Sequence, residues 1–363
     1  MTYDHSQMHF FLGANTPQGF VSRFGQIIDP VRCKRCYIIK GGPGSGKSTL
    51  MKGFADEAEK LGMRPIYFHC SSDVASLDAV SADGDRYVIL DGTPPHAVEP
   101  GCPGAFETLV PLGDCWNEEA LQKDRSAILE LMNRNRLMHA QCRMYLSAAG
   151  SLLGEVSGMA RDYVFPEKVA RFASAVASRE FGRRAPAPGN ERVYFLSAVT
   201  DRGLFSFNGT IEAMCDKLYV IDDDCGAASA MLLALLRSFA LESGRDIISC
   251  YCPMSPYEKL EHLFIPELRL GFTTSNKRHP YPGELFRTIH ARRFMDTDGF
   301  DAHKLRVRFT MRAASELLGE AASCMAQAKK IHDEIEKYYI ASMDFEKVRE
   351  KGLEVVSSLK QGQ

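Results

Sequence analysis

The sequence predicts an α/β fold in which a unit of strands and helices occurs twice in tandem, each copy followed by a helical hairpin. A short apolar run at 36–39 leads into a glycine-rich loop and then into a segment of helical period. Segments of the first half recur in the second at a nearly constant offset of about 183 residues, as duplication of a domain would produce. Late in each half, apolar residues alternate by three and four, which is typical of long packed helices.

Length and composition favour two soluble domains. At 363 residues the chain is long for one hydrophobic core, so we expect a first domain at 1–184, a linker at 185–190 and a second domain at 191–363. The net charge of −2 disfavours extensive contact with nucleic acid. The first residues lack a basic start followed by an apolar run, so no signal peptide is expected. The most apolar stretch, 227–241, is interrupted by Arg237, so no membrane span is expected. The odd number of cysteines, 11, favours reduced thiols, and we expect a cytoplasmic protein.

The most informative element is Gly41–Ser48, which fits the phosphate-binding pattern G-x-x-x-x-G-K-[ST]. The helix expected after it has Leu50 and Phe54 on its apolar face and ends at Gly62. Glycines allow backbone N–H groups to face phosphate oxygens, and the helix N-terminus adds the positive end of its dipole. The residues expected to bind the nucleotide are Gly41, Gly42, Pro43, Gly44, Ser45, Gly46, Lys47, Ser48 and Thr49.

Two side chains of this loop have specific expected roles. Lys47 would reach the β- and γ-phosphates, and the Ser48 hydroxyl would bind Mg²⁺. The ordinary alternative is a glycine-rich turn between a strand and a helix, but the order of strand, loop and helix favours a nucleotide. We expect ATP rather than GTP, because Asn276–His279 begins like a guanine-reading motif but ends in His instead of Asp.

Two more strands are expected downstream, each ending near acidic residues. The strand at 64–70 opens into Ser71–Asp73, where Ser72 or Asp73 would cap the next helix or contact the waters of Mg²⁺. The strand at 86–91 ends in Asp91, which would bind Mg²⁺ through water beside the glycine-rich loop. The alternative for Asp91 is the start of a turn before Gly92.

The candidate catalytic residues are Lys47, Asp91 and His96. His96 has a counterpart, His279, in the second half, and it would sense the γ-phosphate or position a loop, although a lone loop histidine is more often structural. Glu99 is the nearest later carboxylate that would orient a water, but no spacing requires it. The sequence does not identify a catalytic base.

The helical regions repeat between the halves. Apolar stripes run over 142–163 and 311–339, and a shorter helix follows each, starting near Pro166 and Phe345. Such stripes usually pack against the same protein, and the alternative is a surface for a protein partner or for self-association.

The second copy of the glycine-rich loop, Asp222–Ala230, is degenerate. Gly226 matches Gly44, but no lysine matches Lys47, and three aspartates would repel phosphate. We expect this half to be structural or regulatory, and it could donate an arginine to the first half. The candidate arginines are Arg237, Arg278, Arg292 and Arg293.

Residues 41–49 together with Asp91 resemble the P-loop NTPase superfamily. The resemblance implies a three-layer α/β/α fold, Lys47 on phosphate, and Ser48 with Asp91 around Mg²⁺. The Gly-Ala-Asn-Thr-Pro segment from Gly13 and the Asp-Gly-Thr-Pro-Pro-His segment from Asp91 are similar to those of a family of bacterial ATP-binding proteins with two tandem P-loop-like domains.

Three functions are compatible with this pattern. The first is an ATPase whose nucleotide state changes how the two halves or their helical hairpins pack. The second is a small-molecule kinase, which would need an acceptor pocket. The third is an ATP sensor without turnover, which is favoured by Gly92 standing where many ATPases have a second acidic residue.

Overall fold

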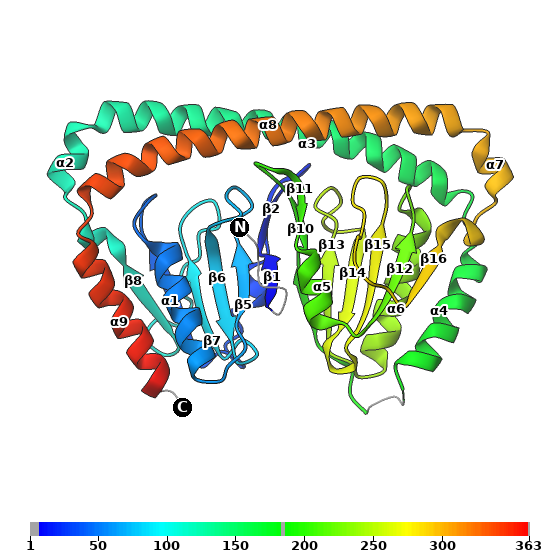
Figure 1. Cartoon of the computed structure of the whole chain (residues 1–363), viewed down its shortest axis with the longest axis horizontal. Coiled ribbons are helices and arrows are strands. Elements are labelled where there is room, and N and C mark those ends of the chain that lie inside the picture. The colour runs from blue at the N-terminus through cyan, green and yellow to red at the C-terminus, as the bar shows by residue number, and fades with distance from the viewer. Residues whose placement is uncertain (1–6, 183–185, 362–363) are drawn as a thin grey trace.

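The computed structural model describes residues 7–182 and 186–361 of the chain and confirms the α/β class (Figure 1). Residues 1–6, 183–185 and 362–363 lie outside the described residues. The described residues therefore exclude residue 185, the first of the predicted linker. They also exclude most of the N-terminal segment in which no signal peptide was expected.

The first six-stranded sheet has the glycine-rich loop at the end of one of its inner strands. Only β6 runs antiparallel to both its neighbours, and the remaining pairs are parallel. In spatial order the strands are β1 (Met8–Phe11), β5 (Ile66–His69), β6 (Leu77–Ala82), β7 (Tyr87–Asp91), β4 (Arg35–Lys40) and β8 (Glu107–Pro111).

The second six-stranded sheet repeats this order with the corresponding strands. Its antiparallel strand is β14, in the same relative place as β6. In spatial order the strands are β9 (Glu191–Tyr194), β13 (Ile247–Tyr251), β14 (Leu260–Ile265), β15 (Leu270–Ser275), β12 (Lys217–Asp222) and β16 (Arg287–His290). We refer to the structures built on the first and second sheets as unit one and unit two.

The smaller elements also occur in corresponding pairs. Two-stranded ribbons, β2 (Gly13–Thr16) with β3 (Gly19–Ser22) and β10 (Ser197–Thr200) with β11 (Gly203–Ser206), lie between the sheets. The short helices α2 (Glu118–Lys123) and α7 (Thr297–Asp301) precede the two long helices, and α5 (Asn208–Met214) packs on β1.

The predicted long helices are confirmed as α3 (Arg125–Arg161) and α8 (Lys304–Ser342). They form an antiparallel pair that spans both units, as the top of Figure 1 shows, and the Asn135 amide donates to the Ala328 carbonyl at 2.8 Å. The shorter helices that follow are α4 (Pro166–Glu180), which has Pro166 in its first turn, and α9 (Phe345–Gln361). The sequence therefore located all four helices, but the predicted hairpin after each copy is wrong, because α3 packs on α8 of the other half.

Each of the short helices α4 and α9 packs on the unit opposite to the one that precedes it in the chain. Helix α9 packs on α1 (Lys47–Lys60) of unit one, and α4 packs on α6 (Ala227–Glu242) of unit two. Backbone hydrogen bonds fix both crossings: Asp344 N–H donates to Cys115 O at 2.7 Å, and Phe165 N–H donates to Phe294 O at 2.8 Å. The segment 1–184 therefore contributes α4 to unit two, and the segment 191–363 contributes α9 to unit one.

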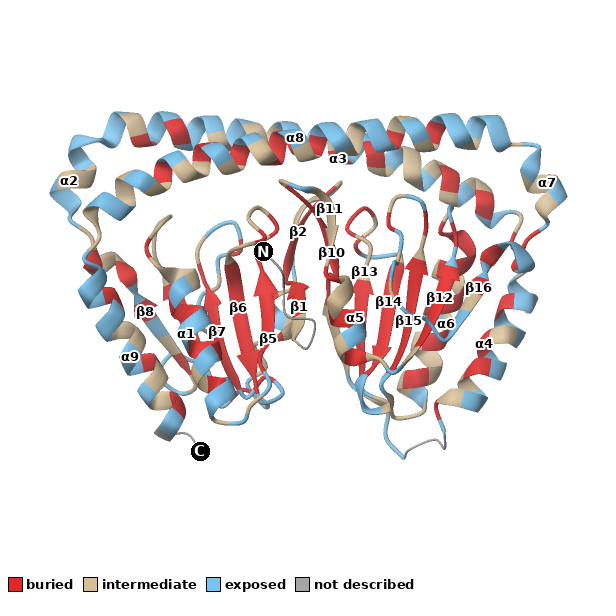
Figure 2. Ribbon diagram, viewed as in Figure 1, coloured by how far each residue is buried: buried red, intermediate tan, exposed pale blue. Residues whose placement is uncertain are grey.

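The layers differ from a simple stack of helices on both faces of each sheet. The outer face of sheet one is covered by α1 and α9, and that of sheet two by α4 and α6. The inner faces contribute to one core shared by both units, which includes Phe10 and Leu90 of the first and Val220 and Ile248 of the second. Figure 2 shows the inner strands of both sheets mostly buried, whereas the edge strands β8 and β16 are partly exposed. The neighbouring unit thus takes the place of a second helical layer.

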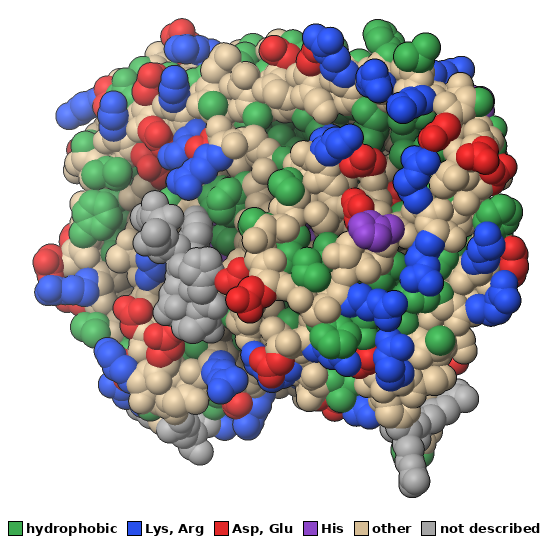
Figure 3. Space-filling model, turned by 45° about the vertical axis from the view of Figure 1, so that its right-hand side comes forward, with side chains coloured by type: hydrophobic (Ala, Val, Ile, Leu, Met, Phe, Trp, Pro, Cys, Tyr) green, Lys and Arg blue, Asp and Glu red, His purple; other side chains and the backbone are tan. Residues whose placement is uncertain are grey.

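On the face in Figure 3, basic and acidic side chains are interspersed over much of the surface, in keeping with the net charge of −2. Among the helices that the structure describes, none has the combination of length and apolar character needed to cross a membrane.

Candidate functional site

The glycine-rich loop joins the end of β4 to the start of α1, as the sequence predicted. Gly44 has a φ of +65° and Gly46 a φ of +89°, in the left-handed region where side chains are strained. Gly62, with a φ of +78°, follows the end of α1. The loop conformation therefore requires glycine at two of the predicted positions.

Lys47 and Asp91 are brought together beside this loop. Lys47 Nζ donates to Gly41 O at 2.9 Å and to Gly42 O at 2.7 Å, and it lies 3.5 Å from Asp91 Oδ2. Asp91 Oδ1 accepts hydrogen bonds from the N–H and hydroxyl of Thr93, at 2.9 and 2.5 Å. One carboxylate oxygen of Asp91 is thereby fixed, and the other faces the lysine.

The other predicted loop residues have distinct surroundings. The Ser45 hydroxyl is buried and donates to Gly42 O at 2.8 Å, so it stabilises the loop itself. The Ser48 hydroxyl accepts from Leu77 N–H at 3.1 Å, which places it against the start of β6. Thr49 is exposed on the first turn of α1, and Pro43 is half-buried.

Helix α8 covers the loop, which the sequence did not predict. Gly44 N–H donates to Glu336 Oε1 at 3.2 Å, and Tyr339 packs so closely on Gly42 that a β-carbon there would lie 2.7 Å from its ring. His332, 3.4 Å from the Glu336 carboxylate, and the Gly44 N–H both lower the pKa of Glu336. Glu336 is therefore an anion bound to a backbone donor of the loop.

The single tryptophan of the chain belongs to this contact. Trp116 lies 5.9 Å from Tyr339 in an edge-to-face arrangement, and its ring approaches Gly42. Val348 of α9 approaches Gly46 on the other side of the loop. Helices α8 and α9, which lie late in the chain, thus enclose the glycine-rich loop, which lies early in it.

A second carboxylate, Asp78, lies in the same region and was missed by the sequence analysis. Burial and the nearby charge of Asp91 raise the pKa of Asp78 to about 8. His96, the tentative catalytic residue, is buried with Nε2 3.4 Å from Asp78 Oδ1, and burial lowers the pKa of His96 to about 4. The sequence did contain a signal for this strand, because Leu77–Ala82 and Leu260–Ile265 are separated by the offset of the repeat.

One expectation for the neighbouring loops is wrong. Residues 71–76 form a turn before the strand β6, so Ser72 and Asp73 cap no helix. Asp73 instead accepts from Ser76 Oγ at 2.9 Å and pairs with Lys329 of α8 at 3.4 Å. Glu99 is exposed and held by Lys40 Nζ at 2.6 Å, which gives its carboxylate a partner outside the loop.

In unit two, the corresponding loop is filled by one of its own side chains. The buried carboxylate of Asp223 accepts hydrogen bonds from the N–H groups of Cys225, Gly226 and Ser229, at 3.1, 2.9 and 2.8 Å. Gly226 has a φ of +76° and directly precedes α6, as Gly46 precedes α1, so the predicted match of Gly226 to Gly44 is wrong. The loop between β12 and α6 is also shorter than the loop between β4 and α1. An internal carboxylate therefore takes the backbone donors that an external anion would need.

The arginines considered as donors to unit one have partners within unit two and its helices. Arg237 Nε binds Glu191 at 2.7 Å, and Arg292 pairs with Asp301. The Arg293 guanidinium lies over the ring of Phe172, and that of Arg278 contacts Met311.

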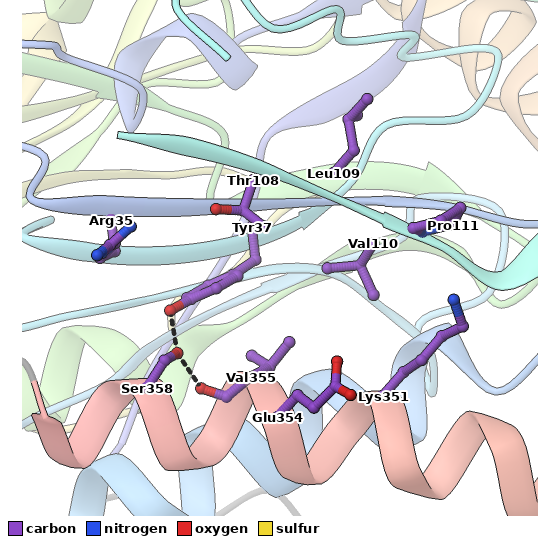
Figure 4. A pocket seen from close by; sticks show the side chains of 10 residues that line it. All are labelled: Arg35, Tyr37, Thr108, Leu109, Val110, Pro111, Lys351, Glu354, Val355 and Ser358. Carbon is purple, nitrogen blue, oxygen red and sulfur yellow. Dashed lines mark hydrogen bonds between the residues drawn. The ribbon is translucent and has the colours of Figure 1, made fainter. Parts of the chain in front are cut away.

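A hollow at the edge of sheet one lies apart from the loop. Figure 4 shows it between α9 and the strands β4 and β8, with the Tyr37 hydroxyl bonded to that of Ser358 and the charged groups of Lys351 and Glu354 at its rim. Its lining contains none of the predicted site residues.

The donor set beside the loop consists of oxygen atoms. Ser48 would supply a hydroxyl, and Asp78 and Asp91 would supply carboxyl oxygens, and oxygen is the kind of ligand that Mg²⁺ prefers. The Nδ1 atom of His96 is buried and has no hydrogen-bond partner in the described part of the chain. These residues fit a hydrated Mg²⁺ better than a softer metal. Comparison of the chain with protein-family models, with curated proteins and with solved structures finds no match.

Proposed function

We propose that this protein binds Mg-ATP at the glycine-rich loop of unit one and hydrolyses it, and that the bound nucleotide controls how α8 and α9 pack on that unit. The observation that carries the proposal is the hydrogen bond from Gly44 N–H to the carboxylate of Glu336. A backbone donor in a loop of this sequence is where a phosphate oxygen would bind. The chain thus supplies its own anion at a phosphate position.

Nucleotide binding and helix packing compete in this arrangement. A phosphate oxygen and the Glu336 carboxylate are both negative and need the same N–H donor, so they exclude each other. Lys47 would turn from the carbonyls of Gly41 and Gly42 toward the phosphates. ATP would therefore release the end of α8 from the loop.

The catalytic roles follow from the residues beside the loop. Ser48 and Asp91 would hold Mg²⁺, which when bound supplies positive charge against the β- and γ-phosphate oxygens. The Asp91 carboxylate already has one oxygen fixed by Thr93, so the other is oriented before any ligand arrives. His96 is a neutral buried imidazole beside Asp78, suited to positioning rather than to carrying charge.

Unit two is proposed to be a duplicated, non-binding copy. Asp223 already accepts from three backbone donors of its loop, and a triphosphate would have to displace a buried carboxylate. Because α8 starts in unit two and ends on the loop of unit one, movement at the loop would be transmitted to unit two. We place this protein in the cytoplasm, where ATP is available.

The test is nucleotide binding and phosphate release by purified protein with and without Lys47→Ala. We expect the wild type to bind a fluorescent ATP analogue and release phosphate, and the variant to lose about 100-fold or more of its turnover. Lys60→Ala, on the same helix and exposed, should behave as wild type. Absence of ATP binding by the wild type would contradict the proposal.

Two other results would assign the site differently. Tight binding of ATP without any phosphate release would support a sensor. ADP formation that rises above background only when a metabolite is added would support a kinase.

A further inference from the structure

Asp78 and Asp91 lie at adjoining ends of two neighbouring strands. Strands β6 and β7 pair antiparallel, and the last paired residues at this end are Ala79 and Leu90, which are followed by Asp78 and Asp91. Asp78 lies at an irregularity of β6 against β5, where Phe68 pairs with Ala79 and His69 with Leu77. Two acids this close to each other are costly to ionise together. Both side chains are buried, at 5% and 7% exposure, so water screens them poorly.

Unit two carries different residues at the corresponding place. In β14 and β15, His262 pairs with Thr273, so the residues that adjoin this last pair are Glu261 and Thr274, and only one of them is an acid. The Glu261 carboxylate also has a lysine, Lys259, at 3.6 Å. The copy with a filled loop therefore carries one carboxylate and its own cation at this position.

Unit one lacks both of these compensations. The residue that corresponds to Lys259 is Ser76, immediately before β6. The cation that faces the pair is Lys47, 3.5 Å from Asp91, and under the proposed function this lysine moves to the phosphates. Two buried acids would then lie next to each other without this positive group.

We propose that Asp78 and Asp91 together form the carboxylate pair that holds the hydrated Mg²⁺ of the nucleotide. This inference rests on the proposed function and adds Asp78 to its metal site. Leu77 N–H holds the Ser48 hydroxyl at 3.1 Å, so the residue next to Asp78 already touches the third oxygen donor. Asp78 acts on the coordinated waters, as outer partners of a metal do.

The test compares Asp78→Asn with its counterpart in unit two, Glu261→Gln. For each protein, ATP affinity is measured by calorimetry with Mg²⁺ and with EDTA. We expect the factor by which Mg²⁺ raises ATP affinity to be about tenfold smaller in Asp78→Asn than in the wild type. Glu261→Gln should keep that gain. An unchanged Mg²⁺ gain in Asp78→Asn, or an equal loss in Glu261→Gln, would overturn the inference.

Thermal unfolding without nucleotide is a second readout, and it also shows that the variants fold. Asp78→Asn should unfold at a higher temperature than wild type, because it replaces a buried acid beside Asp91 with a neutral amide. Glu261→Gln should unfold at a lower temperature, because it leaves the charge of Lys259 unpaired. A lower unfolding temperature for Asp78→Asn would count against the pair.

A separate arm distinguishes failure of the inference from failure of the proposed function. Mn²⁺ alone is titrated and followed by electron paramagnetic resonance. If the wild type bound no ATP, the proposed function would fail, whereas Mn²⁺ binding that Asp78→Asn abolishes would still support the carboxylate pair. No Mn²⁺ binding by the wild type, with or without ATP, would overturn it.

Discussion

The Glu336 carboxylate determines which group the Gly44 N–H binds. Its pKa is lowered by His332 and by Gly44 N–H, so it remains an anion at neutral pH. A phosphate has to replace it, and the free energy of the replaced contact is subtracted from that of ATP binding. The strength of this one hydrogen bond therefore sets part of the ATP affinity.

Glu336→Gln should bind ATP more tightly than the wild type. Loss of the charge weakens the bond to Gly44 and removes repulsion of the phosphates, which we expect to raise affinity by about three- to tenfold. Titration with a fluorescent ATP analogue measures the change. Glu334→Gln, two residues away and exposed, is the matched control and should not differ from wild type. Unchanged or weaker binding by Glu336→Gln would show that the carboxylate does not compete with the nucleotide.

The sequence located the loop residues of this site but not the side chains that cover or complete it. Gly44, Gly46 and Lys47 belong to a contiguous pattern whose backbone conformation is local. Glu336 reaches the loop from 292 residues away, through helix packing that no spacing encodes. Asp78 was missed because its strand contains little apolar alternation, although its match to Glu261 was present in the repeat.

At the scale of the element, one ion-pair cluster holds α4 on unit two. The Glu180 carboxylate at the end of α4 accepts from Lys217 Nζ at 2.7 Å and from the Tyr219 hydroxyl at 2.6 Å. Burial alone would raise the pKa of Glu180, but the hydrogen bonds from Lys217, Tyr219 and Arg179 lower it to about 2. This cluster ties a helix that follows unit one to a strand of unit two.

Glu180→Gln should lower the free energy of unfolding at neutral pH by about 1–3 kcal/mol. Because the folded pKa lies below the unfolded value of about 4.3, the stabilisation is present above that value and lost as the pH falls toward 2. The difference in unfolding temperature between wild type and variant should thus shrink between pH 4 and pH 2, as measured by circular dichroism. Glu167→Gln, exposed in the first turn of α4, is the control. A difference that stays constant over this range would contradict the assignment.

The elements were more predictable than their packing partners. The long helices α3 and α8 follow from apolar periodicity, which is a property of the chain itself. The hairpin strand β6 was not predicted, since Leu77–Ala82 is short and interrupted by Asp78 and Ser81. Periodicity also shows that α4 and α9 are amphipathic, but it does not show which sheet each of them covers.

At the scale of the whole molecule, the units are joined by exchanged helices and by a shared core. Phe11 and Phe195 exchange two backbone hydrogen bonds, at 2.8 and 3.0 Å, in the middle of a core formed by both inner faces. Arg192 of unit two binds the buried carboxylate of Asp85 of unit one at 2.6 Å. Neither unit buries the apolar inner face of its sheet without the other unit.

Cutting the chain between the halves should therefore leave them associated. A protease site inserted after Ala187, which is exposed, would give two fragments that each contribute a long and a short helix to the other. We expect the cleaved protein to elute in size-exclusion chromatography at the position of the intact chain, because separation would expose the shared core. Separation without denaturant would contradict the exchanged arrangement.

The central claim is that Mg-ATP displaces the end of α8 from the glycine-rich loop of unit one. The most direct measurement is the distance between spin labels on α8 at Lys337 and on α1 at Asp56, both exposed, attached through bio-orthogonal side chains because the chain has 11 cysteines. We predict that saturating Mg-ATP shifts the distance distribution to longer values, and that Lys47→Ala abolishes the shift. An unchanged distribution in protein shown to have ATP bound would contradict the claim.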